Sequence, residues 1–188
     1  MNTVTVNKIL NVSESYQAPQ RMLELMLDAE EREKTFNEFL NYETDLSYEW
    51  FHQYFENEHA DRKTKKQDFT PNELSELLTH LVGPSDSYHE TAAGTGGVLI
   101  KHWNKNKNAW FHAEEMSDRS IPFLIFNMAI RGVNGVVLHG DAITREMQEV
   151  YLIRNTNQAE FSEVIQMPKT EELMNHFDIR KWSEEKND

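Results

Sequence analysis

The sequence contains no cysteine, so disulfide bonds and thiolate metal sites are excluded. No apolar run approaches the about 18 residues that a membrane-spanning helix needs. The segment Met1–Leu10 lacks the basic start and apolar stretch of a secretory signal. The eight histidines are scattered, without an HExxH motif or a histidine–carboxylate cluster at ligand spacing, so no metal site is predicted. These absences predict a soluble, cytoplasmic protein with no membrane association.

Basic charge is also scarce, because 19 Lys and Arg stand against 32 Asp and Glu, for a formal net charge of −13. Proteins that bind DNA alone neutralise its phosphates with clustered basic side chains. The longest such cluster here is the segment 62–66, Arg-Lys-Thr-Lys-Lys. Autonomous DNA binding is therefore not expected, although contact with nucleic acid within a complex stays open. The acidity either suits a basic protein partner or keeps the chain soluble.

Apolar residues are numerous enough for a folded core, since the 188 residues are 38% hydrophobic and include ten Phe and four Trp. Residues 1–66 are predicted to form a helical N-terminal region. One apolar stripe at helical spacing consists of Met22, Leu25, Met26 and Ala29. A second helix is predicted to hold Tyr48, Trp50, Phe51, Tyr54 and Phe55. These aromatic residues lack interleaved Lys or Arg, which favours packing in a core over stacking on nucleic acid.

A helix is predicted to begin at Thr70, which serves as N-cap, with Pro71 at the first helical position and Glu73 completing a capping box. Its buried stripe is predicted to consist of Leu74, Leu77, Leu78 and Leu81. The pair Gly83-Pro84 ends it.

Strands and helices then alternate. Strands are predicted at Tyr88–Thr91, Ala109–Glu114 and Gly135–His139, with helices from Val98 and over 121–128 between them. This order is typical of an α/β unit with parallel strands. Two further strands, Val150–Ile153 and Glu163–Gln166, precede an amphipathic helix over Glu171–Trp182. The sequence thus predicts a Rossmann-like domain over 67–170, with a partly parallel sheet flanked by helices, and a C-terminal helix and tail over 171–188.

The glycine-rich turn carries the main functional signal. Gly94-Thr95-Gly96 follows a strand and opens a helix, as a nucleotide-binding loop does. Glu115 (or its neighbour Glu114) lies at the end of the second strand, where a carboxylate accepts hydrogen bonds from ribose hydroxyls. Asp141 ends the third strand, so the three features are expected to converge on one crevice. Position 99 is leucine where dinucleotide loops prefer a third glycine, which favours a ligand without phosphates.

These motifs give the chain a specific resemblance. Residues from Lys65 to about Pro168 resemble the N-terminal half of the catalytic domain of adenine-N6 DNA methyltransferases, above all the modification subunits of type I restriction systems. That family has a Phe-Tyr/Thr-Pro segment, an Asp-Pro-Ala-Ala-Gly-Thr-Gly-Gly turn, a Glu, an Asn-Met pair and a Gly-Asp pair. The matching segments here are Phe69-Thr70-Pro71, Glu90-Thr91-Ala92-Ala93-Gly94-Thr95-Gly96-Gly97, Glu115, Asn127-Met128 and Gly140-Asp141.

The resemblance implies that S-adenosyl-L-methionine is the cofactor. By it, the segment 69–71 flanks the cofactor, Glu90 lies by the methionine moiety, Glu115 holds the ribose and Asp141 holds the adenine. The full set of cofactor-binding residues that it implies is Phe69, Thr70, Pro71, Glu90, Ala92, Gly94, Thr95, Gly96, Glu115, Met116, Asp141 and Ala142.

The chain differs from the family at the catalytic motif, Asn/Asp-Pro-Pro-Tyr/Phe. The sequence contains no Pro-Pro, and alignment of 161–170 with that motif sets Met167, Lys169 and Thr170 against its acceptor, second proline and aromatic ring. A thioether is a weak hydrogen-bond acceptor. The segment Asn155-Thr156-Asn157 is the other candidate, but it has neither proline nor ring. The chain is therefore expected to be a truncated relative that does not methylate by itself, with no catalytic residue assigned.

Three interpretations of function stay open. The first is a non-catalytic S-adenosylmethionine-binding protein that acts as a regulator, as a sensor of cofactor level, or as a decoy that assembles with host modification or restriction subunits, as a phage product would. The second is an enzyme, either one half of a split methyltransferase or a protein that degrades the cofactor. The third is an assembly surface with relic motifs, in which an edge strand near Glu163–Met167 is covered by homodimerisation or by the C-terminal helix.

Overall fold

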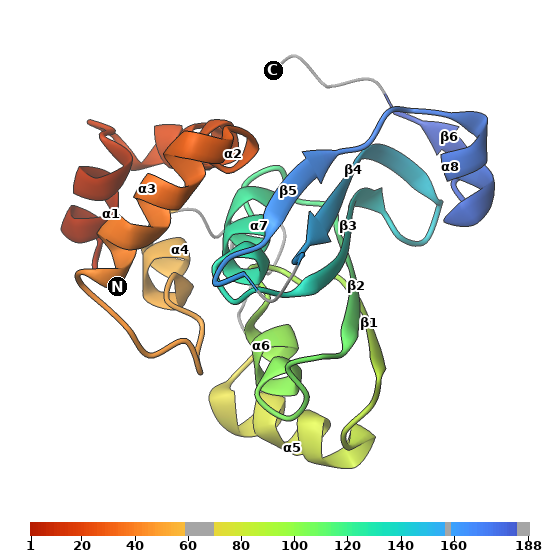
Figure 1. Ribbon diagram of the computed structural model, residues 1–188, viewed down its shortest axis with the longest axis horizontal. Coiled ribbons are helices and arrows are strands. Elements are labelled where there is room, and N and C mark those ends of the chain that lie inside the picture. The colour runs from red at the N-terminus through yellow and green to blue at the C-terminus, as the bar shows by residue number, and fades with distance from the viewer. Residues whose placement is uncertain (59–69, 157–158, 184–188) are drawn as a thin grey trace.

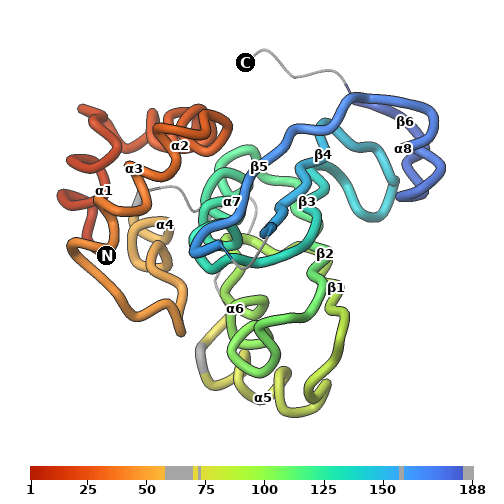
Figure 2. The backbone as a smooth tube through the Cα atoms, viewed as in Figure 1, coloured from red at the N-terminus to blue at the C-terminus, as the bar shows by residue number. Residues whose placement is uncertain are grey.

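The computed structural model describes residues 1–58, 70–156 and 159–183. The N-terminal part is helical and forms a group beside the sheet (Figures 1 and 2). Its elements are α1 (Thr3–Leu10), the 3₁₀ turn η1 (Ser15–Gln17), α2 (Ala18–Leu27), α3 (Ala29–Leu40) and α4 (His52–Glu58). Helix α1 was not predicted, and Trp50 and Phe51 precede α4 instead of lying inside it.

The remainder is an α/β unit, as predicted. Its strands are β1 (Ser87–Thr91), β2 (Trp110–Glu115), β3 (Asn134–Asp141), β4 (Glu146–Arg154), β5 (Glu163–Gln166) and β6 (Lys181–Trp182). Its helices are α5 (Asn72–Val82), α6 (Gly97–Trp103), α7 (Ile121–Ala129) and α8 (Glu171–His176). The sheet order is β1-β2-β3-β4-β5, with β6 beside β4. None of the helices in the described ranges is long and apolar enough to cross a membrane.

The sheet is parallel on one side and antiparallel on the other. Strands β1, β2 and β3 pair in parallel through the crossover helices α6 and α7. Strand β4 runs antiparallel to both β3 and β5. Only residues 142–145 separate β3 from β4, and a connection this short permits only an antiparallel pair. The partly parallel sheet of the sequence prediction is confirmed.

The C-terminal helix is shorter than predicted. Helix α8 ends at His176, although its N-cap Thr170 accepts from the Leu173 amide as a good helix start does. Asp178 has a φ of 52°, in the left-handed region, which turns the chain away from the helix axis. The residues that follow, Lys181–Trp182, pair in parallel with the start of β4.

The leucine stripe of α5 is not buried, which corrects the sequence prediction. Relative exposures are 45% for Leu74, 54% for Leu77, 39% for Leu78 and 74% for Leu81. Ser75 and Thr79 face inward instead, at 3% and 1%. The cap also differs, because the N-cap is Pro71 and no side chain caps the helix. Helical periodicity identifies an apolar stripe, but it does not show whether another element packs against that stripe.

The main core lies between the helices and one face of the sheet. The rings of Phe36, Phe39 and Phe51 surround Phe126 of α7 at centroid distances of 5.2, 4.8 and 5.1 Å. The N-terminal helices therefore share one core with α7, which lies between them and the sheet (Figure 1). Burial of each such ring contributes about 2–3 kcal/mol. The predicted aromatic core is confirmed for 50, 51, 54 and 55, whereas Tyr48 is 36% exposed.

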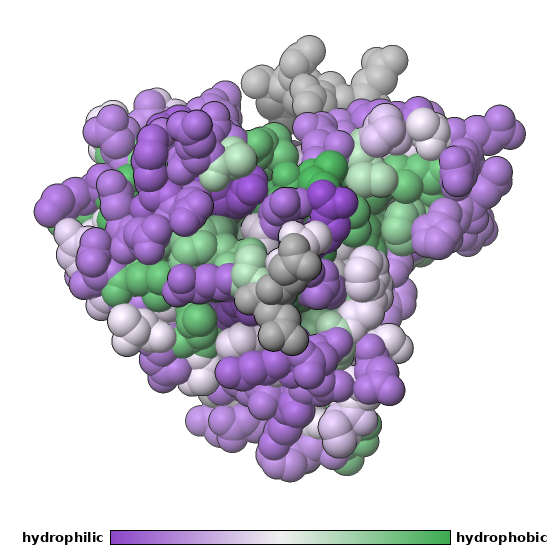
Figure 3. Space-filling model, in the orientation of Figure 1, coloured by the Kyte–Doolittle hydropathy of each residue, from purple (hydrophilic) through white to green (hydrophobic). Residues whose placement is uncertain are grey.

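The opposite face of the sheet is covered only in part. A smaller core of Val136, Leu138, Met147, Val150 and Ile179 covers β3 and β4 beneath α8 and β6. On β1 and β2 the same face carries polar side chains that are partly open to solvent. The surface seen in Figure 3 is mostly hydrophilic, with smaller hydrophobic patches, as the composition leads one to expect.

Candidate cofactor-binding site

The glycine-rich loop joins β1 to α6 with three residues at positive φ. These are Ala92 at 58°, Gly94 at 59° and Gly96 at 93°. A Cβ on Gly96 would lie 3.0 Å from Leu124 Cδ1 of α7, so glycine is needed there for conformation and for space. Ala92 has a side chain at a strained φ, which marks the turn as held by its surroundings. The Ala93 amide donates to the Glu114 carbonyl at 3.0 Å, which fixes the loop to β2.

Asn127 of α7 supports this loop from beneath. Its Nδ2 donates to the Thr95 carbonyl and to Glu49 Oε1, both at 2.8 Å. Arg131 Nη1 donates in turn to the Asn127 carbonyl and Oδ1 at 2.8 and 2.9 Å. Burial lowers the pKa of Arg131 to about 9, although nearby carboxylates, Glu49 first, act in the opposite direction. The sequence singled out Asn127 by resemblance alone, and the structure gives it a positioning role.

A cavity of about 260 Å³ opens between the loop, α4 and the start of α5. Its lining residues are Glu49, His52, Phe55, Thr70, Ser75, Glu90, Ala92, Ala93, Gly94, Gly97, Val98, Glu115 and Ser120. Five predicted site residues lie among them: Thr70, Glu90, Ala92, Gly94 and Glu115. Six others do not line it: Pro71, Thr95, Gly96, Met116, Asp141 and Ala142. Phe69 lies outside the described residues.

Glu115 connects the loop to the turn after β2. Its Oε2 accepts from the Gly94 amide at 2.7 Å, and its Oε1 accepts from the Met116 and Ser117 amides at 2.9 and 2.8 Å. A carboxylate offers about four acceptor positions. The three amides therefore leave room for one more donor on Oε2. Met116 contributes its backbone here, while its side chain is 59% exposed.

Glu90 lines the cavity from the end of β1. The Tyr88 hydroxyl donates to its Oε2 at 3.1 Å, and the Tyr88 ring stacks on His102 of α6 at 3.8 Å. Burial raises the pKa of Glu90 to about 7, and the charge of Glu115 adds to the rise, although hydrogen bonds from Tyr88 and the Leu99 amide oppose it. Glu90 therefore changes charge near neutral pH, which suits a group that meets a cationic ligand.

Glu49 was missed by the sequence prediction, because nothing in the local pattern of 44–51 marks it. Burial raises its pKa. Its Oε1 accepts from Asn127, and its buried Oε2 has no hydrogen-bond partner among the described residues. An unpartnered buried carboxylate oxygen beside a cavity is costly unless a ligand donates to it.

Asp141 ends β3, two strands away from β1. Its Oδ1 accepts from the Ile143 and Thr144 amides at 2.8 and 3.2 Å, and these bonds lower its pKa. It closes the β3–β4 turn in this arrangement, and Ala142 follows it in that turn. The expected convergence of three strand ends brings Glu90 and Glu115 to one cavity but leaves Asp141 outside its lining.

A strand, a glycine-rich loop and a helix, with carboxylates at the ends of two parallel strands, define a Rossmann-like domain of the methyltransferase kind. The chain belongs to the N-6 DNA Methylase family, whose model matches residues 44–185. The match begins before the glycine loop and includes the segment around Glu49. It also extends beyond the predicted limits of resemblance, Lys65 and Pro168, at both ends.

A curated relative is the type I restriction enzyme MjaVIII methylase subunit of Methanocaldococcus jannaschii. It is 29% identical over 125 residues, which cover 61% of this chain and 21% of the relative. The chain thus matches about a fifth of that protein's length. No solved structure matches the chain.

Proposed function

We propose that the chain binds S-adenosylmethionine in the cavity beneath the glycine loop. The observation that carries the proposal is the charge of the lining, which holds the carboxyl groups of Glu49, Glu90 and Glu115 and neither lysine nor arginine among the described residues. S-adenosylmethionine has a sulfonium and an ammonium group and no phosphate. Such a lining favours this cation and disfavours a dinucleotide or a nucleoside triphosphate.

The residues present fit the cofactor. Glu90 and the unpartnered Oε2 of Glu49 would accept from the ammonium group, and the remaining acceptor position of Glu115 would take a ribose hydroxyl. Asp141 does not line the cavity, and it would accept a hydrogen bond from the adenine amino group at the cavity's edge. When bound, the cofactor supplies an electrophilic methyl group.

We further propose that this chain alone does not transfer that methyl group. The segment aligned with the catalytic motif, Met167–Thr170, follows β5, at the opposite edge of the sheet from β1. Four strand spacings separate these edges, or about 19 Å. The alternative acceptor, Asn155, lies at the opposite end of the strands from the glycine loop. Its backbone amide donates to Asn134 Oδ1 at the start of β3. Neither segment lies beside the carboxylates that would hold the methyl donor.

In this proposal the bound cofactor makes the chain a regulatory or decoy partner for a restriction-modification subunit. The curated relative is named as a methylase subunit, which supports a subunit as the partner. The net charge of −13 suits a basic partner surface.

Isothermal titration with S-adenosylmethionine tests the binding site. We expect binding that is weakened at least tenfold in Glu90→Gln and Glu115→Gln and unchanged in the control Glu38→Gln, whose side chain is exposed on α3. Because Glu90 must be ionised to meet a cation, the ratio of wild-type affinity to Glu90→Gln affinity should rise about tenfold from pH 6 to pH 8. The ratio removes the titration of the cofactor's own ammonium group, which is common to both proteins. No heat of binding at millimolar cofactor would refute the proposal.

A second function, a split methyltransferase, is favoured by one observation. Strand β1 pairs only with β2 in the described part of the chain, so its outer edge, next to the glycine loop, is free to accept a strand from a partner. Transfer of labelled methyl groups to DNA only when a second methylase subunit is added would support this function. Transfer by the chain alone would contradict the proposed lack of activity.

A further inference from the structure

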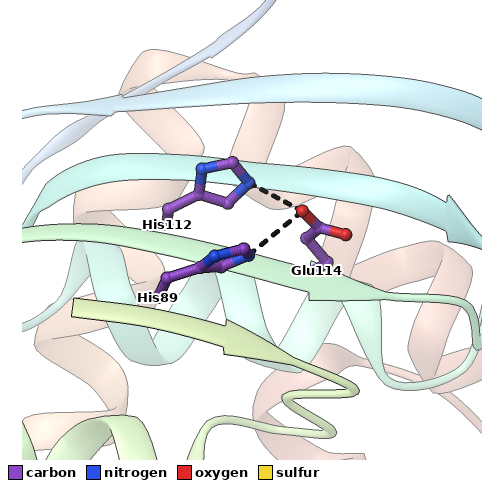
Figure 4. A group of neighbouring side chains, drawn as sticks. All are labelled: His89, His112 and Glu114. Carbon is purple, nitrogen blue, oxygen red and sulfur yellow. Dashed lines mark hydrogen bonds and ion pairs between the residues drawn. The ribbon is translucent and has the colours of Figure 1, made fainter. Parts of the chain in front are cut away.

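A cluster of two histidines and a glutamate lies on the sheet face opposite the cofactor cavity (Figure 4). His89 of β1 and His112 of β2 are direct partners in the parallel register, and Glu114 lies two residues further on the same face of β2. Both Nε2 atoms point at one carboxylate oxygen: Glu114 Oε1 is 3.1 Å from His89 and 3.0 Å from His112. The three donor atoms all lie within 4.8 Å of one another.

Glu114 is held in place by its other oxygen. Arg145 Nη1 donates to Oε2 at 2.7 Å, and the same guanidinium donates to the Phe177 and Asp178 carbonyls. The carboxylate is 1% exposed. Its orientation is therefore fixed from behind, with Oε1 toward the imidazoles, in the way that outer partners orient metal ligands.

We propose that His89 Nε2, His112 Nε2 and Glu114 Oε1 bind a divalent transition-metal ion, with Zn²⁺ as the best fit. Two imidazoles and one carboxylate form a three-ligand zinc donor set, whereas Mg²⁺ and Ca²⁺ prefer oxygen alone. Tetrahedral bonds of about 2.0–2.1 Å place donors about 3.3 Å apart, so the two separations between an imidazole Nε2 and Glu114 Oε1 need to open by only a few tenths of an ångström. The two Nε2 atoms lie within 4.8 Å of each other and have to settle at the same spacing. His89, with a side chain 55% exposed, has room for this movement.

Three protein ligands leave one coordination position open. The cluster lies in an open hollow of about 610 Å³, which Trp110, His176 and Phe177 also line. Water or a donor from a partner chain can therefore reach the fourth position. The site shares no residue with the cofactor cavity, so its existence does not depend on the proposed cofactor.

The alternative is a metal-free hydrogen-bond cluster, in which both imidazoles only donate to Glu114. The test is titration of Zn²⁺ into the full chain, freed of metal by chelation and of any histidine tag. We expect one zinc ion per chain, and a Co²⁺ form with the visible absorption of a tetrahedral centre. Zinc should also raise the melting temperature of the wild-type chain.

The variants His89→Ala and His112→Ala should each weaken zinc binding by at least about 10- to 100-fold. Loss of a residue that only orients a metal ligand already costs that much, and these variants remove a ligand itself. His80→Ala is the matched control, because His80 is exposed on α5 and its Nδ1 contacts the Glu76 carbonyl of the same helix. Both variants replace side chains that are at least 23% exposed, so a shared loss of fold is not expected, and circular dichroism checks it. Absence of stoichiometric binding, or equal affinity in wild type and both variants, would overturn the proposal.

Discussion

Two carboxyl groups on opposite faces of the sheet, Glu90 and Glu114, have pKa values that are shifted in opposite directions. On the helix-covered face, no cation among the described residues lowers the pKa of Glu90, and burial raises it to about 7. On the other face, the Glu114 side chain is only 1% exposed, but His112 and Arg145 hold its pKa at about 2. Strands β1 and β2 supply both faces by simple alternation of side chains. The difference shows that cationic partners can outweigh the effect of burial on the pKa of a carboxylate.

The largest test of this comparison removes the cation. Arg145→Met leaves the Glu114 charge buried without the guanidinium that bonds its Oε2 at 2.7 Å and should lower the free energy of unfolding by about 3–5 kcal/mol, measured by urea denaturation. Arg154→Met is the matched control, because the Arg154–Glu163 pair is 49% and 46% exposed and should contribute less than about 1 kcal/mol. Equal effects of the two variants would contradict the contrast between the faces.

The next test is the pH dependence of stability. The raised pKa of Glu90 gives a contribution that is fully present below about pH 4.5 and lost as the pH rises through about 7, worth at most about 3 kcal/mol. Glu114 acts in the opposite sense, because its contribution is present above about pH 4.5 and is lost as the pH falls toward 2. The stability difference between wild type and Glu90→Gln should therefore shift between pH 5 and pH 8. Parallel pH profiles would show that burial does not raise the pKa of Glu90.

A smaller effect is expected at the glycine loop. Gly96→Ala places a Cβ at a φ of 93° and against Leu124, and should cost about 1–3 kcal/mol of stability. Gly97→Ala is the control one residue further on, where φ is not positive and nothing lies within 4 Å of the added Cβ. Thermal unfolding of the two variants side by side gives the comparison. Two equal melting temperatures would count against the conformational requirement at Gly96.

The smallest effect should come from the exposed face of α5. Leu81→Gln removes a leucine that is 74% exposed and should change stability by less than about 0.5 kcal/mol. Leu99→Ala on α6, at 0% exposure, should cost about 2–5 kcal/mol. Chemical denaturation distinguishes these values easily. A large loss in Leu81→Gln would mean that the stripe is covered after all.

The local sequence pattern was enough to predict the strand–loop–helix unit of β1, α6 and β2. The alternation of strands and helices, the glycine-rich turn and the apolar residues of each element are all visible within short stretches of sequence. Strand β5 begins and ends where the sequence predicts, at Glu163 and Gln166. The turn at Asp178 and the pairing of β6 with β4 depend on contacts between distant residues, so they were missed. The histidine cluster was missed for the same reason, since His89 and His112 are neighbours only through strand register.

Within the candidate cavity, Glu90, Ala92, Gly94 and Glu115 come from the glycine loop and strand ends that the sequence singled out, whereas Asp141 does not line it. The sequence prediction missed Glu49, whose side chain accepts a hydrogen bond from Asn127 at the cavity. Asn127 is bonded in turn to Arg131, and both residues lie far from Glu49 along the chain. Side chains brought in by tertiary hydrogen bonds carry no periodic signal, and only a structure or the extent of the family match reveals them.

The carbonyl groups of Leu46 and Tyr48 accept from Arg131 at 2.8 and 2.7 Å, beside the Glu49–Asn127 bond. These contacts fasten a surface segment to the helix that carries the loop. A fragment that starts at residue 67 would lose three of the acceptors that the Arg131 guanidinium and the Asn127 side-chain amide use, the carbonyls of Leu46 and Tyr48 and Glu49 Oε1. The smallest fragment able to refold with an ordered loop should therefore begin before Leu46, near the start of the family match at residue 44.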